Sequence, residues 1–123
     1  MDSRLKRWVI LQHLGDPNDP SGKHFDLLLE AEKNCRTWRL ENLPRKDASP
    51  VKCTPLQPHS LEWLEVNERE VSGGRGIAKR FITGLYSGLL PSDEMNPVRV
   101  HLKGKEWQGI LEIDKIFCRL TTN

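Results

Sequence analysis

The sequence has few cysteines, and they are not arranged as a metal or disulfide framework. Only three occur in 123 residues, namely Cys35, Cys53 and Cys118. Their number is odd, their spacings are wide and no CxxC pair exists, so neither a zinc ribbon nor a set of disulfides is indicated. We expect free thiols and a reducing compartment, for which the cytoplasm is the simplest choice.

Long apolar runs and a large excess of charge are also missing. No stretch of about 18 apolar residues is present, so no membrane span is predicted. The N-terminal stretch MDSRLKRWVILQH has basic residues before a short apolar run but no small-residue cleavage site, which argues against a signal peptide. The net charge is only +2, which excludes strong nonspecific binding to nucleic acid through bulk charge but leaves a local basic groove open.

The length and the pattern of short apolar runs predict a single domain that spans residues 1–123. Glycine and proline separate runs that are typical of strands, and these lie at 7–13, 24–31, 35–40, 77–83, 97–103, 106–114 and 115–121. The close spacing of the last three runs favours antiparallel hairpins. We therefore expect a mostly β fold, a small antiparallel β-barrel with one or two short helical turns, and a monomer.

One helical turn and four tryptophans complete the expected core. The turn is predicted at 60–64, with Ser60 as its cap and with Trp63 and Leu64 facing inward. We expect Trp8, Trp38, Trp63 and Trp107 to be core residues, because tryptophan supplies much of the buried area in a small barrel.

A leucine-rich strand carries two side chains that bind metals in other proteins. In the stretch HFDLLLE at 24–30, His24 and Asp26 are two positions apart, so they project from the same face of a strand, about 6.5–7 Å apart. Pairing with the preceding strand brings His13 beside His24. Two imidazoles and one carboxylate suit Mn, Zn or Fe better than Mg or Ca and leave coordination positions open. The alternative is a group of hydrogen-bonded side chains without a metal, because a His-x-Asp pair also arises by chance.

A glycine-rich turn is the second candidate binding feature. In the stretch SGGRG at 72–76, the backbone N–H groups and Arg75 are suited to hold a phosphate. The stretch lacks the GK[ST] ending of a Walker loop, and the alternative is a simple turn. Lys79 and Arg80 lie on opposite faces of the next strand, so only one of them can point into a groove. We assign no role to His101.

Several of these motifs, in the same order, resemble those of the 3′-phosphoesterase domain family, which occurs at the N-terminus of bacterial DNA ligase D and as free-standing small proteins. The family has a strand ending in Gln-x-His or Gln-His, then His-Tyr-Asp-Phe-Arg-Leu-Glu, a Ser-Trp strand, His-Pro-Leu-Glu-Tyr, and a Gly-x-x-Gly turn into a strand ending Gly-x-Tyr. The similar stretches here are VILQH at 9–13, HFDLLLE at 24–30, Thr37-Trp38, HSLEW at 59–63 and GGRGIAKRFITGLY at 73–86. The resemblance covers residues 7–86, and the C-terminal strands share only its general character.

The resemblance implies a fold, an activity and a set of site residues. Members are small β-barrels with a crescent groove that remove a terminal ribonucleoside or a 3′-phosphate from nucleic-acid ends in DNA repair and leave a 3′-OH. Carried over by position, His13, His24 and Asp26 hold a divalent ion, typically manganese, and His59 contacts the reacting phosphate. The implied partners are 3′ ends of DNA or of RNA–DNA primer-templates, and a separate DNA ligase or polymerase.

The chain departs from the family pattern at the phosphate clamp. Leu28 stands where the family has the arginine of His-x-Asp-x-Arg, and Trp63 stands where it has a tyrosine. A second family arginine, upstream of the His-Pro-Leu-Glu motif, has no clear counterpart. The candidate replacements for these phosphate contacts are Arg75, Lys79, Lys52 and Arg39.

Three functions follow from this mixture of shared and altered residues. The first is a metal-dependent phosphoesterase that acts on nucleic-acid 3′ ends. The second is a weak or inactive homologue that binds such ends or a repair partner, because leucine at position 28 cannot grip a phosphate. The third is action on another small phosphorylated substrate.

Overall fold

Nine strands and one short helix make up the part of the chain that the structure, a computed structural model, describes, namely residues 5–93 and 95–122. The strands are β1 (Lys6–Leu14), β2 (Lys23–Glu30), β3 (Cys35–Leu40), β4 (Val51–His59), β5 (Glu68–Glu70), β6 (Ile77–Ser87), β7 (Val98–Lys103), β8 (Gly109–Asp114) and β9 (Phe117–Thr121), and the 3-10 helix η1 (Leu61–Glu65) follows β4. Within these ranges no helix has both the length and the apolar character needed to cross a bilayer.

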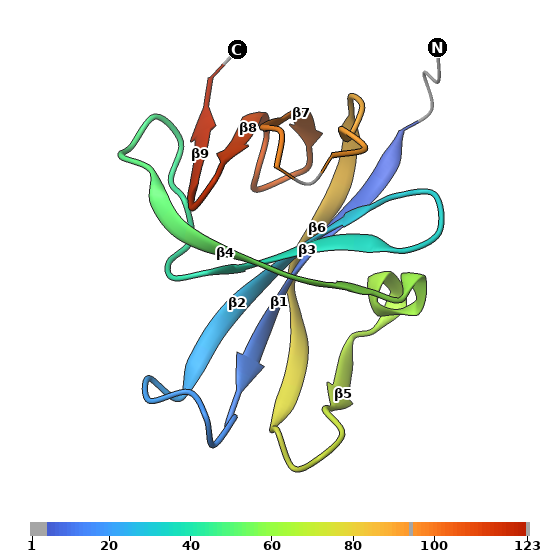
Figure 1. The fold of residues 1–123 in the computed structure, drawn as a ribbon, viewed down its shortest axis with the longest axis vertical. Helices are drawn as coiled ribbons and strands as arrows, with labels where there is room; N and C mark the ends of the chain where they lie inside the picture. The colour runs from blue at the N-terminus through green and yellow to red at the C-terminus, as the bar shows by residue number, and fades with distance from the viewer. Residues whose placement is uncertain (1–4, 94, 123) are drawn as a thin grey trace.

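The strands form one antiparallel sheet that closes in a ring, as the sequence predicts. Their order is β1-β2-β3-β4-β9-β8-β7-β6-β5, and β1 also pairs with β6. In Figure 1, β1 and β6 run along most of the length of the molecule and β2 lies beside β1 in its lower half, while β7, β8 and β9 lie together at its upper end. The pairing of β1 with β6 shifts register between Ile10 and Leu11, so Phe81 has no partner on β1. Such a bulge bends a strand and re-aims the side chains that follow it.

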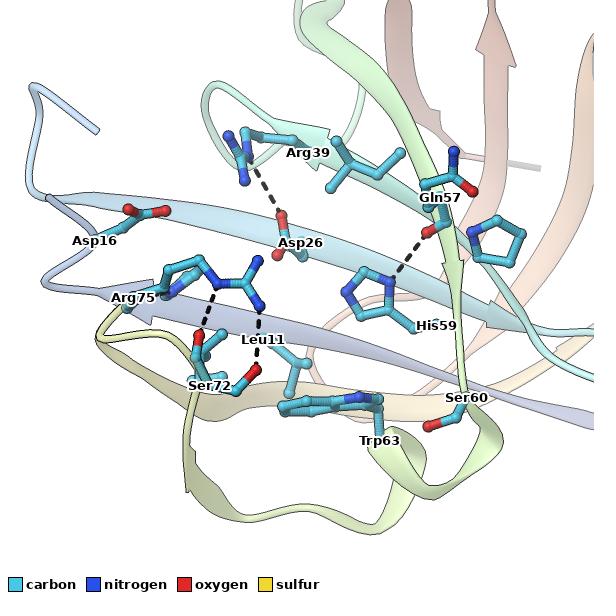
Figure 2. A pocket seen from close by; sticks show the side chains of 15 residues that line it. Leu11, Asp16, Asp26, Arg39, Gln57, His59, Ser60, Trp63, Ser72 and Arg75 are labelled. Carbon is cyan, nitrogen blue, oxygen red and sulfur yellow. Dashed lines mark hydrogen bonds and ion pairs between the residues drawn. The ribbon is translucent and has the colours of Figure 1, made fainter. Parts of the chain in front are cut away.

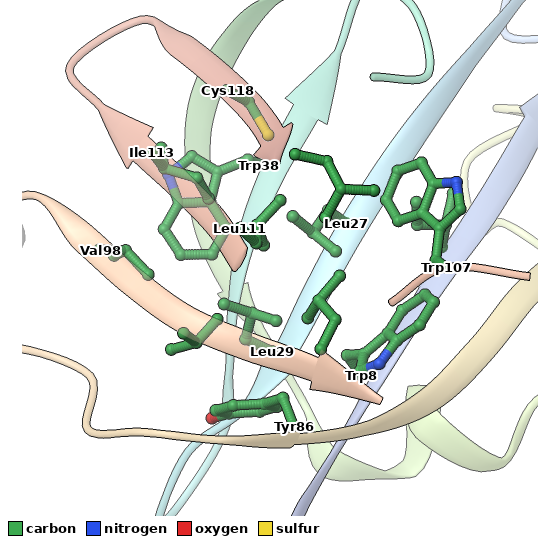
Figure 3. Packing of buried hydrophobic residues seen from close by; sticks show 14 of the residues in the cluster. Trp8, Leu27, Leu29, Trp38, Tyr86, Val98, Trp107, Leu111, Ile113 and Cys118 are labelled. Carbon is green, nitrogen blue, oxygen red and sulfur yellow. The ribbon is translucent and has the colours of Figure 1, made fainter. Parts of the chain in front are cut away.

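The strands β1 and β2 are buried on both faces. One face contributes to the main core inside the ring, which Figure 3 shows around Trp8, Leu27 and Leu29. The other face packs against η1 and forms a second group, here called the outer cluster, whose buried members are Val9, Leu11, Leu28, Cys35 and Leu64. A strand that is covered on both faces reads as a continuous apolar run, which explains the three leucines of HFDLLLE.

Three of the four tryptophans lie in the main core. Trp8 and Trp107 stack with ring centroids 5.8 Å apart, and Trp38 is 3% exposed. The expectation is wrong for Trp63, which is only partly buried and packs against the outer cluster. The Arg69 guanidinium lies over its indole, 5.0 Å from the ring centroid.

The three cysteines are free and buried, in agreement with the expected absence of disulfides. Burial raises the pKa of the Cys35 and Cys53 thiols to about 11 and that of Cys118 to about 12. The thiolate, which is the reactive form, is therefore suppressed at neutral pH, and we assign these residues to packing.

The structure corrects the predicted elements in three places. β4 and β5 were not predicted, because β4 contains Pro55 and Pro58 and β5 is short and fully exposed. β6 continues to Ser87, beyond the predicted end at 83. Ser60 occupies the N-cap position of η1 but makes no side-chain capping hydrogen bond, so the predicted capping by its hydroxyl is wrong. The helical turn itself is present, and Leu64 is buried as expected.

Candidate metal centre and phosphate pocket

Antiparallel pairing of β1 with β2 places two histidines side by side. His13 lies directly opposite His24 in the register, so the strands pair as the sequence suggests. The Nδ1 atom of His13 is 3.0 Å from the Nε2 atom of His24, and the rings meet edge to face with centroids 4.5 Å apart. Both residues are buried, at 7% and 6% exposure.

Asp26 completes the cluster from the same face of β2. Its Oδ1 atom is 3.6 Å from the Nε2 atom of His24, and one ligand atom from each of the three residues lies within 4.8 Å of the others. The Oδ1 atom is buried and has no hydrogen-bond partner among the described residues. A buried carboxylate oxygen without a donor is costly unless a cation compensates it.

The outer nitrogen of each ring is already engaged by an acceptor. The Nδ1 atom of His24 lies 2.9 Å from the Oδ2 atom of Asp19, and the Nε2 atom of His13 contacts the backbone carbonyl of Arg75. A carboxylate and a carbonyl only accept, so both outer nitrogens must carry hydrogen. The inner nitrogens then present lone pairs to each other, and a cation, either a proton or a metal ion, has to lie between them.

Asp19 is fixed by its own loop before it meets His24. Its Oδ1 atom accepts hydrogen bonds from the backbone N–H and the hydroxyl of Ser21, at 3.0 and 2.7 Å. The hydrogen bond from His24, followed by those from Ser21, lowers the pKa of Asp19 to about 2. Burial lowers the pKa of His24, but its contacts with Asp26 and Asp19 outweigh burial and raise that pKa above its usual value. Sequence reasoning missed Asp19, for which the signal was an acidic loop that ends just before His24.

The glycine-rich turn at 72–76 packs against the end of β1. Gly76 has a φ of +89°, and a Cβ atom there would collide with the carbonyl oxygen of Leu14. This close approach holds the Arg75 carbonyl against the ring of His13. The turn therefore orients a histidine of the cluster, a role that the sequence does not reveal.

A pocket of about 540 Å³ opens beside the cluster, and Figure 2 shows its wall. His59 enters from the end of β4, with its Nδ1 atom 3.1 Å from the Gln57 carbonyl. Because the carbonyl accepts, Nδ1 donates, and Nε2 is left for a ligand. The Trp63 ring stands 6.1 Å from the His59 ring. Residues that line the pocket include His13, Asp16, Asp26, Arg39, His59 and Arg75.

The predicted phosphate-binding residues are divided by the structure. Arg75 lines the pocket, and its Nε atom donates to the Ser72 carbonyl at 2.8 Å. Lys79 and Lys52 do not line it. Lys79 lies opposite Gln12, on the far face of the sheet from the cluster, and pairs with Glu68 at 3.4 Å. Lys52 pairs with Phe117 at the other end of β4.

Three further residues, Leu28, Arg80 and Arg39, bear on how a phosphate could be bound. Leu28 is fully buried in the outer cluster, so this position packs against the helix η1 and does not face the pocket opening. Arg80, whose strand neighbour Lys79 turns away, points to the cluster's face of the sheet and donates to the Leu64 carbonyl at 2.8 Å. Arg39, one of the candidate replacements for the phosphate contacts, lines the pocket.

Comparisons with known proteins add no family to this geometry. No protein-family model matches the chain, and no curated protein matches it either. The argument for function therefore rests on the residues of the site.

Proposed function

We propose that the protein is a metal-dependent phosphoesterase that trims 3′-phosphate or 3′-ribonucleotide ends of nucleic acid. The observation that carries the proposal is the meeting of three acceptor atoms, from His13, His24 and Asp26. Two of these residues, His13 and Asp26, line a pocket that also holds a further histidine and two arginines. The resemblance to the ligase D 3′-phosphoesterase domains supports the same assignment.

The donor set fits one divalent transition metal. Atoms bonded to the same such ion at about 2.1 Å each lie no more than about 4.2 Å apart. Two of the three distances satisfy this limit, namely those from the His24 Nε2 atom to the His13 Nδ1 atom, 3.0 Å, and to the Asp26 Oδ1 atom, 3.6 Å. The three ligand atoms as a set lie within 4.8 Å of one another, so a bound ion would draw them slightly closer together. Imidazole and carboxylate together suit manganese, with zinc or iron as alternatives. When bound, such an ion polarises a phosphoryl oxygen and lowers the pKa of a coordinated water.

The protein's own residues supply binding and a proton. Hydrolysis of a 3′-phosphate joins a water oxygen to phosphorus and breaks the bond to the 3′-oxygen, which leaves with a proton. In the proposal, the free Nε2 position of His59 donates that proton, or donates a hydrogen bond to the developing charge. Arg75 supplies positive charge on the other side of the pocket. The released 3′-OH is a substrate for a separate ligase or polymerase, which is the partner that we infer.

The buried leucine at position 28 favours one alternative function. Leu28 is buried in the outer cluster and supplies no phosphate contact, so the pocket holds fewer phosphate ligands than the resemblance implies. The second candidate function is binding of 3′ ends without efficient turnover. Binding without product would identify that function.

The direct test is a cleavage assay with Mn²⁺ and labelled primer-templates that end in a 3′-phosphate or a 3′-ribonucleotide. We expect product from the wild type and from His101→Ala, whose histidine lies on β7, and none from His24→Ala. If the wild type forms no more product than His24→Ala, the proposed activity is wrong.

A further inference from the structure

We infer that Arg39 is the phosphate-binding residue of this site. It lies on β3, next to β2, and supplies the positive charge that Leu28 on β2 cannot. The inference rests on the proposed function and goes beyond it, because it assigns the residue that recognises a terminal phosphate. Position 39 differs from position 28 in one decisive respect, since its side chain is 42% exposed and lines the pocket.

The strand register brings Arg39 to the metal cluster. Arg39 lies directly opposite Asp26 in the pairing of β2 with β3, and its Nε atom is 3.7 Å from the Asp26 Oδ1 atom. This distance is too long for a hydrogen bond but short enough for the charges to attract. The guanidinium is therefore held beside the cluster without occupying the carboxylate oxygen that a metal would use.

One donor of Arg39, the Nε–H group, has no acceptor among the described residues. Its Nε atom is buried and has no hydrogen-bond partner in the described part of the chain. Arg75, which also lines the pocket, donates to Ser72 through Nε and Nη2. Arg80 donates to the Leu64 carbonyl and, like Arg39, has a buried Nε atom without a partner in that part of the chain, but it is not among the residues that line the pocket. Of the two arginines that line the pocket, Arg39 therefore has more donor capacity left for a ligand than Arg75.

The chemistry of these donors points to a phosphate monoester. A guanidinium presents a planar fork that matches two oxygens of one phosphate. A terminal 3′-phosphate offers three non-bridging oxygens and up to two charges, whereas an internal diester offers two oxygens and one charge. With His59 across the pocket and the metal cluster adjacent, Arg39 is placed to engage oxygens that neither of them binds.

The test measures binding, so it does not depend on turnover. We would compare the affinity for two fluorescent single-stranded DNAs that differ only in the end, a 3′-OH or a hydrolysis-resistant 3′-phosphate analogue in which CH₂ replaces the bridging oxygen, by anisotropy with Mn²⁺ present. The variants are Arg39→Gln and Arg39→Lys, and the control is Arg99→Gln, which removes an exposed arginine that pairs with Glu112 on β8. Circular dichroism and Mn²⁺ titration of each variant establish that the fold and the metal centre are intact.

We expect the wild type and Arg99→Gln to prefer the 3′-phosphate end. Arg39→Gln should lose that preference by about tenfold to a hundredfold, as the loss of hydrogen bonds to a charged group implies, while it retains Mn²⁺. Arg39→Lys should restore only part of it, because lysine keeps the charge without the fork. If Arg39→Gln keeps the preference, the assignment of Arg39 is wrong while the proposed function stands. If the wild type itself shows no preference, no residue of the pocket recognises a terminal phosphate and the assignment of Arg39 is wrong. The proposed function fails with it only if the cleavage assay also yields no product.

Discussion

The Nδ1 atom of His13 and the Nε2 atom of His24 face each other at 3.0 Å, and the other nitrogen of each ring is bound to an acceptor. Two lone pairs at this distance repel unless a cation lies between them. Because Asp26 adds a buried oxygen without a donor, the arrangement favours an ion that accepts all three ligands over a single shared proton.

Asp19 is expected to act as a positioning residue for the metal centre. Asp19→Asn keeps an oxygen that can accept from His24 but removes the charge, so Mn²⁺ affinity should fall about 10- to 100-fold, as is usual for such outer partners. Isothermal titration calorimetry measures the change, and Asp114→Asn on β8 is the matched control. Equal affinity in the two variants would show that the Asp19 charge has no part in holding the ion.

Gly76 should matter more than a neighbouring glycine of similar conformation. Gly74 and Gly76 both have positive φ, +68° and +89°, but a Cβ atom meets nothing within 4 Å at Gly74 and collides with the Leu14 backbone at Gly76. Gly74→Ala should lower the free energy of unfolding by about 1–2 kcal/mol, the usual cost of the left-handed conformation.

Gly76→Ala should lower it further and weaken Mn²⁺ binding, because the turn that holds His13 must move. Urea denaturation and metal titration of both variants check this expectation. If Gly76→Ala matches Gly74→Ala in both measurements, the close approach of Gly76 to the Leu14 backbone does not hold His13 in place.

Leu28→Arg is expected to destabilise the protein and not to improve phosphate binding. Leu28 is 0% exposed in the outer cluster beneath η1, and burying a charge there without a partner costs several kcal/mol. Leu28→Met, which nearly conserves volume, should cost less than about 1.5 kcal/mol. Thermal melts of both variants decide the matter, and an arginine variant as stable as the methionine variant would show that position 28 has access to the pocket.

The ion pair of Glu30 with Arg7 should make stability depend on pH. The Glu30 carboxylate accepts from the backbone and the guanidinium of Arg7, and this contact, opposed by burial, lowers the Glu30 pKa below its usual 4.5. The resulting stability is complete above pH 4.5 and is lost as the pH falls through the lowered pKa of the folded protein.

Glu30→Gln should therefore be less stable at pH 7, by roughly 0.5–1 kcal/mol because solvent screens a partly exposed pair. The difference from the wild type should shrink below pH 4.5. Denaturation curves at several pH values test this, and a deficit that stays constant down to strongly acidic pH would contradict the linkage.

The sequence was sufficient for the ring of strands and for the meeting of His13 with His24. Both depend on local patterns, since alternation sets which face a side chain takes and a short loop joins antiparallel neighbours. It was not sufficient for β4, because the two prolines at 55 and 58 make an edge-like strand read as a loop. The approach of the turn at 72–76 to β1 also depends on contacts far apart in the chain.

The phosphate-binding residues show the same limit. Alternation in β6 shows that Lys79 and Arg80 cannot share a face, but only the register against β1, with its shift after Ile10, shows that Lys79 turns away. Arg39 could be named as a candidate from its charge. Its place opposite Asp26 follows from the pairing of β2 with β3, which no local pattern encodes.

The most direct test of the account is a Mn²⁺ titration of the wild type, His24→Ala and His101→Ala, followed by calorimetry. We predict one ion per chain in the wild type and in His101→Ala, and loss of that binding in His24→Ala. If the wild type binds no divalent ion, or if His24→Ala binds it as tightly as the wild type, the cluster of His13, His24 and Asp26 is not a metal centre and the proposed function fails with it.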